Sequence, residues 1–117
     1  MRKTSLSKST FIRGQQCEKS LYLYKHHYDW QNKISVAQQA VFDQGTTVGE
    51  LAQQLFPGGV DCTPDNFYQS KKAVEHTRKE IEAGSAIIYE AAFEFNEILV
   101  YADILIKDVE GWKVYEV

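Results

Sequence analysis

Two carboxylates near the end of the chain lie in segments that are otherwise apolar. Asp103 falls within the stretch YADILIK and Glu116 within WKVYEV, and the two stretches are separated by a DVEG turn. A loop of two residues or of four gives these segments the same antiparallel register, with Ile106 opposite Lys113 and Asp103 opposite Glu116. Directly opposed residues have Cβ atoms about 4.5–5.5 Å apart, where like charges are destabilising.

A bound divalent cation would relieve this repulsion. Mg²⁺ binds proteins through one or two carboxylates, completed by waters and by substrate phosphates. The register therefore predicts a metal site at Asp103 and Glu116. The alternative is a loop of three or five residues, which would send the two acids to opposite faces of the sheet.

The order of segments along the chain is also informative. An Asp on one strand is followed by a Glu on the next, and the early stretch LSKSTFIRGQQCEKSLYLYK contains a Ser-x-Ser entry and a Cys-x-Lys helix start. In this order the chain resembles the PD-(D/E)XK nuclease superfamily, especially its RecB-like and CRISPR-associated exonuclease branch. The resemblance covers most of the chain and rests on the order of the segments more than on any single motif.

The resemblance implies a metal-dependent nuclease that hydrolyses DNA phosphodiesters. Asp103 and Glu116 would hold Mg²⁺ or Mn²⁺, with the main-chain carbonyl of Val117 as a further ligand. Glu50 is the acid available on the long helix that completes the site in this family. The lysine of the family motif would follow Val117, so we expect residues 1–117 to be one partial domain, truncated at its active-site strand and nearly inactive alone.

Helical periodicity conflicts with a site role for Glu50. The helix predicted from Ser35 to Phe56 carries an apolar stripe made of Ala37, Ala40, Val41, Val48, Leu51, Ala52 and Leu55. On an unbroken helix Glu50 points away from this stripe, toward solvent. A bend at Gly45 or Gly49 would redirect it, and two glycines in a helix also indicate a close backbone approach to another element.

Cys17 lies on the apolar stripe of a helix predicted from about Gln16 to His27. Some CRISPR-associated relatives use a cysteine here to bind an iron–sulfur cluster, together with three more near the C-terminus. Those three are not in this chain, and four thiolates are usual for such a cluster. We therefore interpret Cys17 as a small buried apolar residue and expect no cluster.

The charge is unevenly distributed. The net charge is −3, but residues 1–33 hold seven Lys/Arg and two acids whereas residues 34–117 are strongly acidic. A basic arm beside an acidic metal site would bind DNA phosphates in this way. A solvated basic helix would have the same composition.

The predicted fold class is α+β. Helices over about 7–83, one of them starting at Thr63, precede a three-stranded antiparallel sheet over about 86–117. The strand 86–95 alternates strictly, with Ile87, Tyr89 and Ala91 on one face and Ile88, Glu90 and Ala92 on the other. We interpret Glu90 as an edge charge, with a substrate-side group as the alternative.

Other functions remain compatible with this composition. The main alternative is a non-catalytic nucleic-acid-binding or scaffolding module with a decayed nuclease site, and a third is a domain that binds only protein partners. The sequence has neither an apolar run long enough to span a bilayer nor a signal-peptide core, so we expect a cytoplasmic location. A partial domain would also expose a sheet edge and self-associate.

Overall fold

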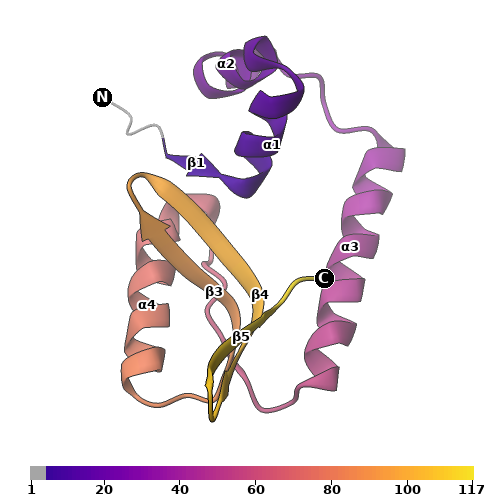
Figure 1. The fold of residues 1–117 in the computed structure, drawn as a ribbon. Coiled ribbons are helices and arrows are strands. Elements are labelled where there is room, and N and C mark those ends of the chain that lie inside the picture. Colours follow the sequence, from indigo (N-terminus) through magenta and orange to yellow (C-terminus); the bar gives the residue numbers. More distant parts are fainter. Residues whose placement is uncertain (1–4) are drawn as a thin grey trace.

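The computed structural model of the chain describes residues 5–117. Its elements are β1 (Leu6–Ser7), α1 (Lys8–Gln16), α2 (Glu18–His26), the 3₁₀ helix η1 (Tyr28–Trp30), α3 (Val36–Leu55), β2 (Val60–Asp61), the 3₁₀ helix η2 (Phe67–Gln69), α4 (Ser70–Glu82), β3 (Ile87–Phe95), β4 (Ile98–Asp108) and β5 (Gly111–Tyr115). The fold is α+β, as the sequence predicts (Figure 1). Over the described range, no helix is both long and apolar enough to cross a membrane.

The sheet is mixed and has five strands, where the sequence predicted three antiparallel ones. The order is β1-β4-β3-β2, and β5 also pairs with β4. β1 and β2 both pair in parallel, β1 with the start of β4 and β2 with β3. Each of these strands has only two residues, which is too short for an alternating pattern to reveal it in the sequence.

The β4–β5 hairpin has the predicted register. Ile106 lies opposite Lys113 and Asp108 opposite Gly111, so the loop consists of two residues, Val109 and Glu110. Ile104 opposite Tyr115 is the last pair of the ladder. Glu116 is the next residue along and lies just beyond the end of β5.

The starts of α1 and α3 follow the local capping chemistry that the sequence predicts, whereas the cap predicted at Thr63 is wrong. Ser7 caps α1 through a reciprocal capping box with Thr10, and the Ser35 side chain accepts a hydrogen bond from the Gln38 N–H at the start of α3. Thr63 caps no helix, because its N–H and hydroxyl both donate to Asp61 and α4 begins only at Ser70.

Cys17 is exposed, so its interpretation as a buried apolar residue was wrong. It lies at the junction where α1 ends and α2 begins. Because the chain is extended at this residue, Cys17 is not part of the α2 stripe on which the interpretation rested.

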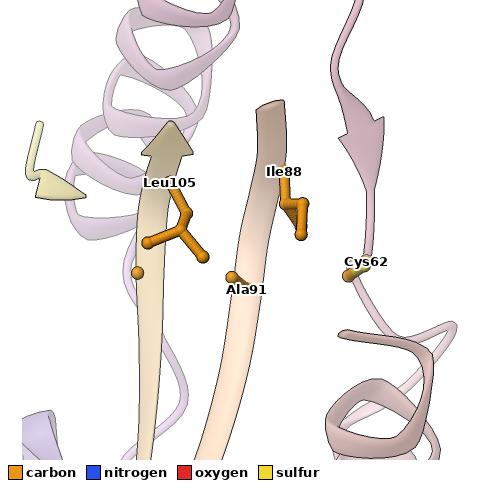
Figure 2. Close-up of a cluster of buried hydrophobic side chains, with 5 residues drawn as sticks. Cys62, Ile88, Ala91 and Leu105 are labelled. Atoms are coloured by element: carbon orange, nitrogen blue, oxygen red, sulfur yellow. The ribbon is translucent and has the colours of Figure 1, made fainter. Parts of the chain in front are cut away.

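The buried core shows that β3 and β4 do not alternate strictly. Ile88 and Ala91 belong to the same buried cluster although they are three residues apart, and so do Ala102 and Leu105 (Figure 2). In regular strands residues three apart point to opposite faces. The alternation between the two sheet faces therefore shifts within each pair, at Glu90 in β3 and at Asp103 in β4. Glu90 has a left-handed backbone, with φ of 53°.

Two helices lie on opposite sides of the sheet (Figure 1). α4 packs against β3, where the buried Thr77 hydroxyl accepts a hydrogen bond of 2.9 Å from the Ala92 N–H. α3 has no buried residue. Its attachment is at its C-terminal end, where the Tyr89 hydroxyl donates to the Phe56 carbonyl and accepts a hydrogen bond of 3.0 Å from the Gly59 N–H.

Gly59 and Gly45 should respond in opposite directions to the same substitution. A Cβ at Gly59 would lie within 3.0 Å of the Tyr89 ring, which is held by its hydrogen bonds, whereas a Cβ at Gly45 would meet nothing within 4 Å. We expect Gly59→Ala to destabilise the fold by about 1–3 kcal/mol. Gly45→Ala should stabilise it by about 1 kcal/mol through helix propensity. Urea denaturation of both variants measures the difference, and equal effects would contradict the close packing at Gly59.

Candidate metal centre

An acidic pocket of about 550 Å³ lies between α3 and the sheet. Its lining includes four carboxylates from four different elements, Glu50 of α3, Asp61 of β2, Glu90 of β3 and Asp103 of β4, together with Val117 after β5. Residues that are far apart in the sequence therefore meet around one space. The sequence predicted Asp103, Val117 and Glu50 as site residues, but it did not predict Asp61.

Asp103 and Glu116 are brought to neighbouring positions by the β4–β5 register. An oxygen of Asp103, Oδ2, accepts a hydrogen bond of 2.8 Å from the Val117 N–H. This bond holds the end of the chain against β4. Glu116 is engaged elsewhere, because its Oε2 lies 2.9 Å from the Lys8 ammonium at the start of α1.

Lys8 is a functional candidate that the sequence did not reveal. Its pKa is raised by the hydrogen bond to Glu116, then by the charge of that carboxylate, with a further contribution from Asp103. The ammonium therefore supplies positive charge at the place where the sequence predicted a cation. Because 108 residues separate the two partners, no local pattern could have indicated the contact.

Glu50 lines the pocket, although α3 shows no bend that redirects it. The residues of α3 that line the pocket are Gly45, Thr46, Gly49, Glu50 and Gln53, which form the polar side of the helix. The apolar stripe points the other way, and Val41, Val48, Leu51 and Leu55 are exposed. The close backbone approach expected at Gly45 and Gly49 is wrong, because a Cβ at either position would meet nothing within 4 Å.

Glu90 lies on an inner strand, because β3 pairs with β4 on one side and β2 on the other, so its interpretation as an edge charge was wrong. The side chain is half-buried and lines the pocket. Burial first, and then the nearby charges of Asp103, Asp61 and Glu116, together raise the pKa of this carboxyl to about 7. Glu90 therefore ionises less readily than an ordinary exposed glutamate.

The oxygen donors of the pocket suit a hard cation such as Mg²⁺. Within residues 5–117, however, no group of three or more His, Cys, Asp or Glu side chains is close enough to hold one metal ion. A site at Asp103 and Glu116 would therefore consist of two carboxylates, completed by main-chain oxygen and water. Cation binding would also have to displace Lys8 from Glu116.

Several basic side chains of the N-terminal segment are engaged within the protein. The Arg13 guanidinium lies over the Tyr24 ring and donates to the Ser20 hydroxyl, and Lys25 donates to the Ser5 carbonyl. Arg2 and Lys3, which contribute to the basic character of this segment, lie outside the described residues. The positive charge is therefore partly used to hold α1 and α2 together.

Comparisons with known proteins identify no relative. No family model, curated protein or solved structure matches the chain.

The raised pKa of Glu90 predicts a specific dependence of stability on pH. The ordinary value of this carboxyl is 4.5 and the folded value is about 7, so between these pH values the folded state keeps a proton that the unfolded state has lost. Stability should therefore fall as the pH rises through this window. Glu90→Gln should remove the fall and stabilise the protein at pH 8 by about 1–2 kcal/mol, since the side chain is only half-buried.

Glu94→Gln is the matched control, because Glu94 is an exposed acid on the same strand. Chemical denaturation at several pH values should show the same fall in stability with rising pH for this variant as for the wild type. The same fall in Glu90→Gln as in the wild type would show that another group causes it.

Proposed function

We propose that this chain carries the metal-binding part of a metal-dependent DNA nuclease domain. The observation that supports it is the position of Asp103 across the end of the β4–β5 ladder from Glu116, at an acidic pocket. The resemblance of segment order to PD-(D/E)XK nucleases assigns the same two residues to the metal. Mg²⁺ or Mn²⁺ would be the cofactor, with Asp103, Glu116 and the Val117 carbonyl as ligands.

Each side chain has a role in this proposal. A cation held by Asp103, Glu116 and the Val117 carbonyl would supply Lewis-acid chemistry, polarising the scissile phosphate and lowering the pKa of a bound water. Asp103 orients the end of β5 through its bond to the Val117 N–H. Glu50 faces the same pocket from α3, where its negative charge would attract the cation without completing a three-carboxylate ligand group. Lys8, once released from Glu116, offers its ammonium to a phosphate oxygen of the substrate.

The second candidate is a nucleic-acid-binding or scaffolding module without catalysis. It is favoured by the ion pair between Glu116 and Lys8, since the lysine ammonium occupies the place proposed for the metal. The two candidates differ in whether a divalent cation binds at all. Binding of a short DNA duplex that needs neither metal nor Asp103 would support this second candidate.

Mn²⁺ should stabilise the protein through Asp103 and Glu116. A ligand that binds only the folded state raises stability by RT ln(1 + [L]/Kd), or about 1.4 kcal/mol at ten times Kd. For a chain of this size we expect the melting temperature to rise by about 4–8 °C for each kcal/mol. Differential scanning calorimetry with millimolar Mn²⁺ measures the rise, which should be absent in Asp103→Asn and Glu116→Gln and reduced in Glu50→Gln.

Glu110→Gln is the control for the loss of one negative charge, because Glu110 lies at the tip of the β4–β5 hairpin outside the pocket. This variant should keep the full response to Mn²⁺. If the wild type gives no binding heat in titration calorimetry and no stabilisation, the nuclease proposal fails.

Removing Lys8 should strengthen cation binding. Its ammonium competes for Glu116, and exposed ion pairs of this kind have small energies. We therefore expect Lys8→Gln to lower the Kd for Mn²⁺ by about two- to fivefold. Lys19→Gln, another lysine of the N-terminal segment, serves as the control in the same titration. An unchanged or higher Kd in Lys8→Gln would contradict competition between the two cations.

A further inference from the structure

The outward face of α3 has the pattern of a helix-pairing seam. Apolar positions recur at alternating intervals of four and three residues, Ala37, Val41, Gln44, Val48, Leu51 and Leu55, with Gln44 as the single polar member. This is the heptad spacing by which two helices pack side by side. All six positions are exposed in the structure, so the seam has no partner within the described chain.

An isolated helix of this composition needs such a partner. α3 contains Gly45, Gly49 and several β-branched residues, all of which are poor helix formers. Most helix stability in proteins comes from packing of the apolar face. In this chain that face is turned away from the sheet, and the polar side lines the acidic pocket.

The seam is complementary to a second copy of itself. Its positions are symmetric about Thr46, so an antiparallel pair places Ala37 opposite Leu55, Val41 opposite Leu51, and Gln44 opposite Val48. Ala37 and Val41 therefore each meet a larger leucine, which fills the space between the helices. A two-fold symmetric interface requires this kind of self-complementarity.

Electrostatics do not oppose the pairing. The positions that flank the seam are uncharged, namely Gln38, Ala40, Gly45, Thr47, Ala52 and Gln54. Asp43 and Glu50 are the only charged residues of α3, and both lie on the opposite side of the helix. Repulsion between two copies of this acidic chain is therefore kept away from the contact.

The exposed area of the chain also exceeds that of a compact monomer. Its accessible surface is 9186 Å², whereas a compact monomer of this mass exposes about 6,500 Å². A standard interface buries about 800 Å² on each partner. The difference between the two accessible surfaces is thus larger than the area that each partner buries in a standard dimer interface.

We propose that this protein forms a homodimer through the outward face of α3, with the two helices antiparallel. The acidic pockets then lie on the far sides of the helix pair and stay open. The dimer requires neither metal nor nucleic acid, so failure of the proposed nuclease function would not contradict the dimer, and absence of the dimer would not contradict the nuclease function.

Sedimentation velocity of the chain over micromolar to near-millimolar concentrations should show a monomer–dimer equilibrium. Leu51→Glu and, separately, Val48→Glu should weaken the dimer at least about tenfold, because each would bury an unpaired charge in the seam. Both positions are exposed and outside the buried cluster, so the monomer should keep its fold and circular dichroism. Val109→Glu at the hairpin tip, which is 99% exposed, is the matched control.

Orientation is tested by disulfide trapping in a Cys17→Ser background, since Cys17 is exposed and Cys62 is buried. In the antiparallel pair Val41→Cys/Leu51→Cys should give disulfide-linked dimers. Neither single variant should do so, because equivalent residues would be about 15 Å apart along the helix. A monomer at every concentration, a dimer unaffected by Leu51→Glu, or cross-linking of the single variants would each overturn the proposal.

Discussion

The interruption of the β3–β4 ladder at Glu90 and Asp103 determines how the rest of the structure is arranged. The pairs on either side, Tyr89 with Ile104 and Ala91 with Ala102, keep one register, so no residue is inserted. Instead the left-handed backbone of Glu90 changes the phase of the strand. Both acids consequently line the pocket, while the flanking small and aliphatic residues form the core beneath α4.

This arrangement has an energetic cost that the fold must offset. A non-glycine residue in the left-handed region costs about 1–2 kcal/mol, and the carboxyl concerned is also half-buried beside other acids. Such local strain persists only where the surrounding structure enforces it, and it is common at functional sites. Here the fully buried Ile88 on one side and Ala91 on the other fix the backbone around it.

The sequence predicted those features that depend on neighbouring residues. Ser35 before a helical pattern predicted the start of α3, and a turn of two or four residues predicted the β4–β5 register, because capping and hairpin geometry are local. Strand phase was mispredicted, since a single backbone angle at Glu90 overrides an alternating pattern.

The candidate site was predicted only in part, for a similar reason. Periodicity identified the apolar stripe of α3 and the exposure of Glu50, but it cannot show that the polar side of the helix lines a pocket. Asp61 lies on a two-residue parallel strand, and Lys8 reaches Glu116 across nearly the whole length of the chain. Contacts of this kind depend on the tertiary fold alone.

The attachment of α3 by one end makes the pocket adjustable. Tyr89 holds the chain at Phe56 and Gly59, and the Phe56 ring contacts Tyr115 with centroids 4.9 Å apart. The half of the helix near Val36 has only exposed residues. A helix of 20 residues is about 30 Å long, so a rotation of about 10° around the Tyr89 anchor moves its far end by about 5 Å. A change in this angle would alter the width of the pocket without exposing any buried side chain of α3, because the helix has none.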